Sequence, residues 1–279
     1  MARRPPRQPS TTPQKPTPTT QDLRERILAD FAVLRVPFSA AHLDAALAQA
    51  VQDGCSHLEF LHRLITDQAG LRRERSTARR IREAKFHELK SLASFDWEFN
   101  AKAIKRIQIE DLATGDFIRR QQNLVFAGHS GVGKSFLVQA IGQLACARGT
   151  RVRYTTSADL LKDLAARIAD QTLSERIRYY ARFELLIIDE FGFDDIERKE
   201  TPHAASLLYK IMDARSQKVS TALVTNIDFE AWGEYLGDPP LAMAFLDRLV
   251  DGAIILKIEG KSYRAHRAAQ SAAKDNLPK

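Results

Sequence analysis

Residues 123–137 read NLVFAGHSGVGKSFL, and this stretch decides the fold. The apolar run 123–127 predicts a buried strand, and the apolar segment that begins at Lys134 predicts a helix. Between them, residues 128–135 match the pattern GxxxxGK[ST]. Glycines let successive backbone amides turn toward an anion, and the first turn of a helix adds partial positive charge at the same point. Strand, loop and helix in this order predict a phosphate-binding loop rather than a glycine turn without a ligand.

The loop supplies the expected cofactor-binding residues, for ATP with Mg²⁺. They are Gly128, His129, Ser130, Gly131, Val132, Gly133, Lys134, Ser135 and Phe136. The Lys134 ammonium is expected to reach the β- and γ-phosphates. The Ser135 hydroxyl is expected to bind Mg²⁺, because this hard cation prefers oxygen ligands. His129 is interpreted as a variable loop position and not as a catalyst.

A second apolar run, LLIIDE at 185–190, ends in two carboxylates. On its own, such an acid is typical of a strand end that caps the next turn. Downstream of a phosphate loop, Asp189 is instead expected to hold the magnesium shell, and Glu190 to orient and deprotonate a water molecule. The pair favours ATP hydrolysis. A P-loop kinase acting on a small metabolite remains as a further option.

Two later residues are candidates for the same reaction. Asn226 follows the strand STALVT, at the sheet edge where α/β proteins gather ligand residues, although it could also be a simple turn residue. Arg248, among apolar neighbours, could be an arginine finger that reaches a neighbouring copy's phosphate, or an ordinary helix-surface ion pair.

Short apolar runs alternate with helical patterns from about residue 93 onward, which is typical of a parallel α/β sheet. The five predicted strands are 123–127, 151–155, 185–189, 221–225 and 253–258. Helices are predicted after Lys134, after a Ser157 cap and after residues 201–202. Upstream, Ser39 predicts one helix that stops near Gly54. A capping box at Ser56 and Glu59 predicts a second helix that ends near Gly70, and a third is expected over 71–90.

Positive charge is concentrated in two stretches. The formal net charge is +7, yet residues 1–20 carry +4 and residues 71–90 carry +5, which leaves −2 for the rest. At 100° per residue, one face of the third helix gathers Arg72, Arg73, Arg75, Arg79, Arg80, Arg82 and Lys90. This face is either a solvated surface or a contact for a polyanion, because residues 71–90 hold only three acids to pair with eight bases. Weaker candidates for the same polyanion contact are Lys162, Arg167, Arg176 and Arg178.

Composition excludes several classes of protein. With 279 residues, 44% hydrophobic and 28% charged, the chain is of ordinary globular size and composition. No apolar stretch approaches the roughly 18 residues that a membrane helix needs. The two cysteines cannot form a disulfide framework, and the proline-rich residues 1–20 lack the apolar core of a secretory signal. We therefore expect a cytoplasmic protein with a disordered tail.

The order of the segments GHSGVGKS, LLIIDE, STALVTN and FLDRLVDGAIILKIEGKSYR resembles the IstB-like family of AAA+ ATPases, relatives of the DnaC-type helicase loaders. The similarity extends to three further stretches, RRIREAKFHELKSLASFDWEF, IEDLATGDFIRRQQNLVF and FEAWGEYLGDPPLAMAFLDRL. The resemblance implies an AAA+ fold with a central parallel five-stranded sheet behind a small all-helical domain. The implied domains are 1–20 (tail), 21–95 (helical, DNA-binding and assembly), 96–260 (ATPase) and 261–279 (basic C-terminal tail).

The resemblance also implies a function, that of the bacterial transposition helpers of this family. They bind duplex DNA with little sequence preference, form homo-oligomers with ATP at subunit interfaces, and present target DNA to a transposase that stimulates hydrolysis. By position, Lys134, Ser135, Asp189 and Glu190 take the nucleotide and metal roles, Asn226 the first sensor and Arg248 the trans-acting finger. The role of Arg264 stays open between nucleotide, DNA and packing. A DnaC-like helicase loader is the alternative.

Overall fold

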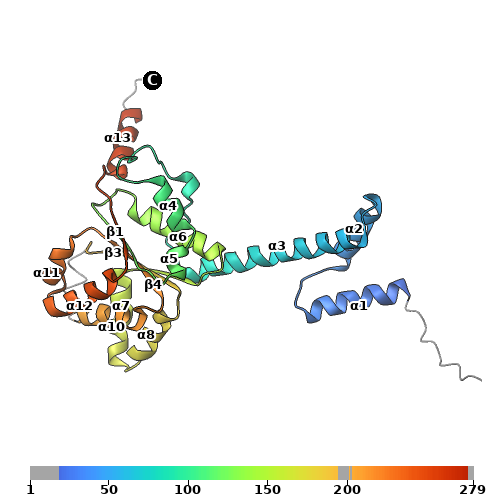
Figure 1. Ribbon diagram of the computed structural model, residues 1–279, viewed down its shortest axis with the longest axis horizontal. Coiled ribbons are helices and arrows are strands. Elements are labelled where there is room, and N and C mark those ends of the chain that lie inside the picture. Colours follow the sequence, from blue (N-terminus) through green and yellow to red (C-terminus); the bar gives the residue numbers. More distant parts are fainter. Residues whose placement is uncertain (1–18, 194–200, 202, 276–279) are drawn as a thin grey trace, which may run out of the picture. The chain divides into compact units, whose positions relative to one another are not determined.

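The computed structural model describes residues 19–193, 201 and 203–275 (Figure 1). The predicted tail falls outside them, apart from Thr19 and Thr20, which begin the first helix. The chain forms two compact units, Met1–Arg73 and Glu74–Lys279. The predicted boundary between the helical and ATPase domains, at 95/96, lies further along the chain.

The first unit is helical, with α1 (Thr20–Val33), α2 (Ala40–Gln52) and the first part of α3 (His57–Ala84). The predicted caps are present: the Ser39 side chain accepts a hydrogen bond from the His42 amide, and Ser56 and Glu59 form the capping box. The predicted helix break at Gly70 is wrong, because α3 continues through it. A helical glycine costs only about 1 kcal/mol, less than restarting a helix. The helix ends at Ala84, before Lys85 with its φ of 62°, so Lys90 does not share the arginine face.

The second unit holds a five-stranded parallel sheet in the order β2-β3-β4-β1-β5. The strands are β1 (Leu124–Ala127), β2 (Val152–Thr156), β3 (Leu185–Phe191), β4 (Ser220–Thr225) and β5 (Ile254–Lys257). All five predicted strands are confirmed to within two residues. The central parallel five-stranded sheet predicted from the sequence is therefore confirmed.

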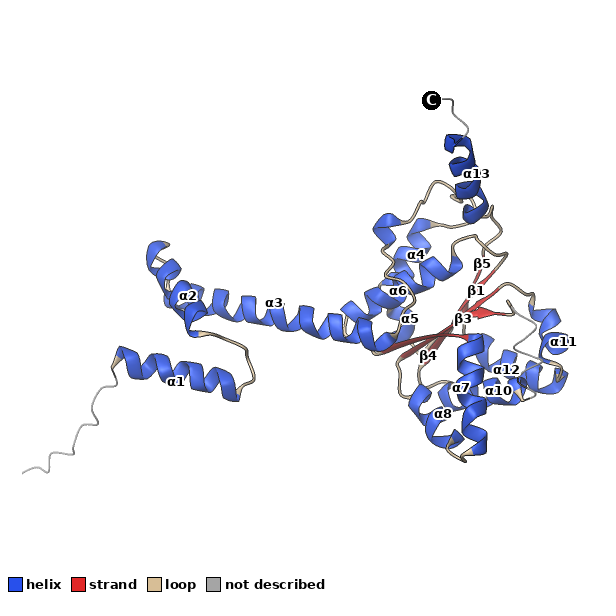
Figure 2. Ribbon diagram, turned by 180° about the vertical axis from the view of Figure 1, so that it is seen from behind, coloured by secondary structure: helices blue, strands red, loops and turns tan. Residues whose placement is uncertain are grey.

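Helices cover both faces of this sheet (Figure 2). One face carries α4 (Arg106–Ala113), α5 (Asp116–Arg119) and α6 (Lys134–Ala147). The other carries α7 (Ser157–Ala169), α8 (Leu173–Ala181), α10 (Ala204–Arg215), α11 (Trp232–Leu236) and α12 (Pro239–Val250). Two short 3-10 helices, η1 (Leu92–Ser94) and η2 (Phe229–Ala231), and the C-terminal α13 (Tyr263–Asp275) complete the described elements.

Alternation along the strands explains the two apolar layers. In β3, Leu185 and Ile187 pack on the α6 side, whereas Leu186 and Ile188 pack on the α10 side, and all four are fully buried. One cap differs from prediction: α7 is capped by Thr156, whose side chain accepts from the Asp159 amide, while Ser157 is the first helical residue. Among the described residues, no helix is long and apolar enough to cross a membrane.

Candidate nucleotide-binding site

The phosphate loop joins β1 to α6, as predicted. Gly128, Gly131 and Gly133 have φ values of 148°, 84° and 102°, a region that side-chain-bearing residues rarely adopt. At Gly128 a Cβ atom would also lie 2.3 Å from the carbonyl oxygen of Ile258, which directly follows β5. The loop therefore requires glycine both for its turn and for its packing against the chain after β5.

Lys134 lies at the first position of α6 and is only 7% exposed. Its Nζ donates to the carbonyl oxygens of Gly128 and His129, at 2.6 and 2.8 Å. Burial lowers the pKa of Lys134 to about 8; the Asp189 carboxylate opposes this shift and nearby Arg264 adds to it. Two loop carbonyls therefore hold the Lys134 ammonium. In the described part of the chain, no acidic side chain forms an ion pair with it.

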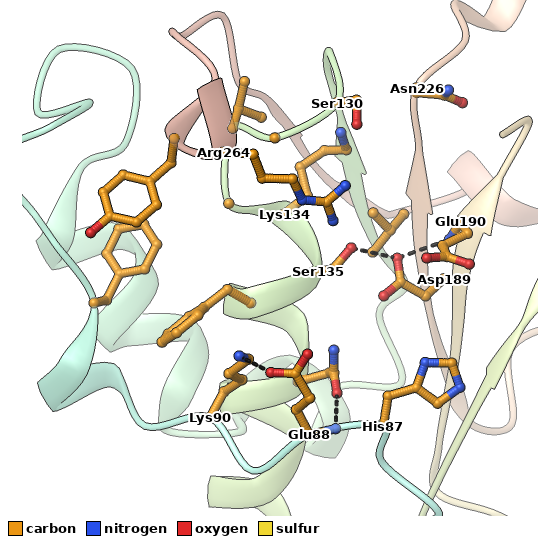
Figure 3. Close-up of a pocket in the computed structure, with 18 of the residues that line it drawn as sticks. His87, Glu88, Lys90, Ser130, Lys134, Ser135, Asp189, Glu190, Asn226 and Arg264 are labelled. Atoms are coloured by element: carbon orange, nitrogen blue, oxygen red, sulfur yellow. Dashed lines mark hydrogen bonds and ion pairs between the residues drawn. The ribbon is translucent and has the colours of Figure 1, made fainter. Parts of the chain in front are cut away.

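Ser135 and Asp189 face each other under the loop (Figure 3). The Ser135 Oγ donates to the Asp189 Oδ1 at 3.0 Å. Asp189 is 1% exposed, and its Oδ2 accepts a 2.8 Å hydrogen bond from the Tyr154 hydroxyl. Burial first, and then the Asp189 carboxylate, raise the pKa of Tyr154, so the phenol remains a donor. One hydroxyl and one carboxylate oxygen beside a phosphate cradle fit Mg²⁺, which takes few protein ligands when phosphates supply others. No cluster of three His, Cys, Asp or Glu that could hold a metal occurs in the described residues.

Glu190 protrudes from the sheet because β3 is irregular at this point. Ile188 pairs with Leu223 and Phe191 with Thr225, so two residues of β3 oppose a single residue of β4. Such a bulge re-aims side chains, and Glu190 has a φ of 61° and an exposed carboxylate. Its backbone amide donates to Asp189 Oδ1 at 2.8 Å. A non-glycine residue held in this conformation costs about 1–3 kcal/mol and is typical of functional sites.

Most of the predicted nucleotide-site residues therefore gather in one cavity of 540 Å³. It is lined by Ser130, Gly131, Val132, Gly133, Lys134, Ser135, Phe136, Asp189, Glu190 and Asn226. Gly128 and His129 contribute the carbonyls that hold Lys134. When the Asn226 side chain is oriented with its nitrogen toward the end of β3, this nitrogen donates to the carbonyl oxygens of Gly192 and Phe191, at 2.9 and 3.1 Å. Asn226 is thereby fixed at the end of β4.

Arg248 lies on α12, outside this cavity. Its Nε pairs with Asp213 at 3.0 Å, its Nη2 donates to the Tyr209 hydroxyl at 2.8 Å, and the guanidinium stacks on the Tyr209 ring. The side chain is 29% exposed. Any action of Arg248 on a nucleotide would have to be on that of another copy.

Arg264, whose role the sequence leaves open, lies at the cavity. The Tyr263 amide donates to the Gly131 carbonyl at 2.9 Å, which fixes the start of α13 against the phosphate loop. Asn100 holds the preceding Lys261 backbone through two 3.0 Å hydrogen bonds. Arg264 and Arg267 consequently line the cavity, and Figure 3 shows Arg264 beside Lys134.

Aromatic residues form another wall of the cavity, in which Phe136 was a predicted cofactor-binding residue and Phe95, Phe99 and Tyr263 were not predicted. Phe95 packs on Phe136 with ring centroids 5.2 Å apart, and Phe99 packs edge-on against Tyr263 at 5.1 Å. All four line the cavity and could stack with a flat ring. The short run SFDWEF carries Phe95 and Phe99 without a periodic pattern, and Phe136 and Tyr263 lie far along the chain, so only the tertiary structure reveals their common surface.

The predicted DNA-binding arginines and Lys162 lie on three helices and do not line the nucleotide cavity. Arg72, Arg73, Arg75, Arg79 and Arg82 are exposed on α3, with Arg80 half-buried. Lys162 on α7 and Arg178 on α8 are also exposed. Arg176 pairs with Asp163 at 2.5 Å and stacks on Tyr179, so its guanidinium is already engaged.

Comparisons with known proteins agree with this geometry. The family model of the IstB-like ATP binding protein matches residues 29–271. The chain is 33% identical over 240 residues to the ATP-binding protein of insertion sequence IS232 from Bacillus thuringiensis subsp. berliner, covering 86% of this chain and 94% of that protein. It is 32% identical to the corresponding proteins of IS5376 from Geobacillus stearothermophilus (87% and 94% covered) and of IS21 from Pseudomonas aeruginosa (83% and 85% covered).

Among solved structures, DnaI shares the fold with a TM-score of 0.50 at 20% identity, over 61% of this chain and 91% of that one. A family match that spans most of the sequence, relatives of nearly the same length, and a phosphate loop above a serine–aspartate pair all agree. The chain belongs to the IstB-like ATP-binding protein family of insertion sequences.

Proposed function

We propose that this protein is an ATPase that assembles on duplex target DNA with ATP, delivers that DNA to the transposase of the same element, and disassembles after hydrolysis. The observation that carries the proposal is the Ser135–Asp189 pair beneath the glycine loop, with Glu190 on a bulge beside it. Relatives named as ATP-binding proteins of insertion sequences support the link to transposition.

Each residue has a defined task in this proposal. The loop amides, Lys134 and Arg264 bind the triphosphate, and the aromatic wall receives the base. Ser135 and Asp189 hold Mg²⁺, which neutralises phosphate charge when bound. Glu190 orients water and accepts its proton, while Asn226, which lines the same cavity, acts as the first sensor. Arg248, half-buried on α12, acts on the nucleotide of an adjacent copy, so that ATP joins neighbours.

Two other functions share the same nucleotide chemistry. A helicase loader is the nearer one, but the likeness to DnaI at 20% identity shows the fold alone. A small-molecule kinase would release ADP with a phosphorylated product and would not respond to DNA. The arginine face of α3 favours a polyanionic partner over a metabolite.

Replacing Glu190 by glutamine tests the proposal. Loss of a general base lowers rates by about 10²–10⁴-fold, so Glu190→Gln should bind ATP normally, hydrolyse it at least about a hundredfold more slowly, and remain assembled on DNA. ATP turnover and particle size are measured with and without duplex DNA. The control is Glu184→Gln, just before the opposite end of β3, where Glu184 pairs with Arg151. Normal turnover in Glu190→Gln, or a particle that stays monomeric with ATP and DNA, would contradict the proposal.

A further inference from the structure

Tyr154 is a buried residue of the edge strand β2 that contacts the proposed metal ligand directly. Its side chain is 2% exposed, and its hydroxyl donates to Asp189 Oδ2 at 2.8 Å. The other oxygen, Oδ1, accepts from both the Ser135 hydroxyl and the Glu190 amide. Three donors on α6, β2 and β3 therefore converge on one carboxylate, as a buried ionised acid requires.

The Tyr154 hydroxyl has a separate geometric effect from the other two donors. Ser135 and Glu190 both bind Oδ1, so these two donors hold the carboxylate at one oxygen and leave Oδ2 to another partner. Within the described part of the chain, the Tyr154 hydroxyl donates to Oδ2. Its hydrogen bond holds the carboxylate at a second oxygen, and so limits the tilt of the carboxylate plane with which Oδ1 faces the phosphate loop.

The Tyr154 ring is in turn packed against the segment that follows α3. The His87 ring meets it edge-on at 5.0 Å between centroids, and the Phe86 ring lies at 6.0 Å. Figure 3 shows His87 and Glu88 on the side of the cavity below Ser135 and Asp189. This contact brings residues next to the basic helix within one side chain of the proposed metal site.

The same segment is fastened to the helix of the phosphate loop. The Gln139 Oε1 accepts from the Glu88 amide at 3.2 Å. The Gln143 side chain donates to the Glu88 carbonyl at 2.9 Å and accepts from the Lys90 amide at 3.2 Å. The side chains of two glutamines of α6 thus hydrogen-bond the backbone of residues 88–90. These bonds keep the neighbouring Phe86 and His87 against Tyr154.

We propose that Tyr154 is a positioning residue of the nucleotide site: its hydroxyl holds the Asp189 carboxylate in the orientation that binds the metal ion of a bound nucleotide, and Phe86 and His87 hold its ring in place. The inference rests on the proposed function in that it needs a metal at Asp189. It adds a route by which the segment after α3 influences that metal.

The test measures metal affinity instead of turnover. Mn²⁺ binding to the full-length protein saturated with a non-hydrolysable ATP analogue is followed by electron paramagnetic resonance. Loss of an outer hydrogen-bond partner of a metal ligand lowers affinity by about 10–100-fold, so Tyr154→Phe should weaken Mn²⁺ binding by at least about tenfold. Affinity for the analogue in the presence of EDTA should not change. His87→Ala, an exposed site, should weaken Mn²⁺ binding in the same direction by less.

Tyr180→Phe is the matched control. Tyr180 is also 2% exposed, and its hydroxyl donates to a carboxylate, Asp163, at 2.6 Å, away from the cavity. This variant should lose a similar hydrogen bond and a similar amount of thermal stability, with Mn²⁺ affinity unchanged. If Tyr154→Phe and Tyr180→Phe bind Mn²⁺ equally well, Tyr154 is a packing residue and the inference is wrong. If the unmodified protein binds no Mn²⁺ with the analogue, the proposed function itself fails.

A second measurement does not depend on the folding of Tyr154→Phe. Single incorporation of 3-fluorotyrosine at 154 retains the ring and the hydroxyl. Its ¹⁹F resonance should move when Mg²⁺ is added to the analogue complex, whereas fluorotyrosine at 180 should not respond. Equal responses at the two positions would overturn the inference.

Discussion

Lys134 shows how burial of one side chain sets a pH dependence. Its pKa of about 8 means that a neutral amine accumulates above that pH in the free protein. A bound triphosphate favours the ammonium, so nucleotide binding above about pH 8 must take up a proton, and affinity should fall as pH rises further. Below that range the group is already charged and contributes no pH dependence.

Calorimetric titration with a non-hydrolysable ATP analogue checks this expectation. At about pH 8.5 the apparent binding enthalpy should vary with the ionisation enthalpy of the buffer, in the sense of proton uptake. Lys134→Arg provides the comparison, since a guanidinium stays charged and should show no such uptake. Identical enthalpies in all buffers for the unmodified protein would show that Lys134 is protonated before ATP arrives.

At the scale of elements, Gly142 marks the contact between α6 and the segment after α3. A Cβ there would lie 2.7 Å from Ile187 Cδ1 and 2.9 Å from Phe86 Cε1. Alanine gains about 1 kcal/mol of helix propensity but overpacks the core by about 2 kcal/mol, so Gly142→Ala should lower the free energy of unfolding by about 1 kcal/mol. Gly70, with no atom within 4 Å of its Cβ position, is the matched control.

Gly70→Ala should raise stability by about 0.5–1 kcal/mol, because it reduces the freedom of the unfolded chain within a continuous helix. Urea unfolding of both variants, followed by circular dichroism, measures the difference. A Gly142→Ala protein as stable as Gly70→Ala would mean that Phe86 does not pack into α6.

Helices and strands could be predicted from the sequence where a pattern of a few neighbouring residues determines them. Apolar runs and the glycine loop fixed the five strands and the start of α6, since periodicity and turn chemistry act over a few residues. The break expected at Gly70 failed because a single glycine is a weak signal inside a long helix. The bulge at Glu190 depends on pairing with β4, which no local pattern encodes.

Side-chain partners across the sheet were the least predictable part of the site. Lys134, Ser135 and Asp189 were identified from motifs, but Tyr154 looks like an ordinary strand residue in the sequence. Arg215 illustrates the same limit. It is fully buried and donates to the carbonyls of Tyr180, Phe183 and Ser220, a role that only the packing of α10 against α8 and β4 defines.

For the molecule as a whole, the distribution of charge leads to a prediction about DNA. Arg72 and Arg75 are exposed on α3 and have no ion-pair partner in the described residues. If each neutralises one DNA phosphate, the slope of log affinity against log salt should become shallower by about 0.9 per arginine removed. Arg72→Gln with Arg75→Gln should therefore reduce the slope by about 2, similarly for duplexes of different sequence, since phosphate contacts do not read bases.

The matched control removes two other exposed arginines, Arg106 and Arg119, which pair with Glu110 and Asp116 on their own helices. Arg106→Gln with Arg119→Gln changes the net charge equally but should leave the slope within about half a unit of that of the unmodified protein, because only contacted phosphates release counterions. Fluorescence anisotropy with a labelled duplex across a salt series, in the presence of a non-hydrolysable ATP analogue, gives both slopes. Equal slopes for the two double variants would mean that net charge alone attracts the duplex and that α3 makes no phosphate contacts through these arginines.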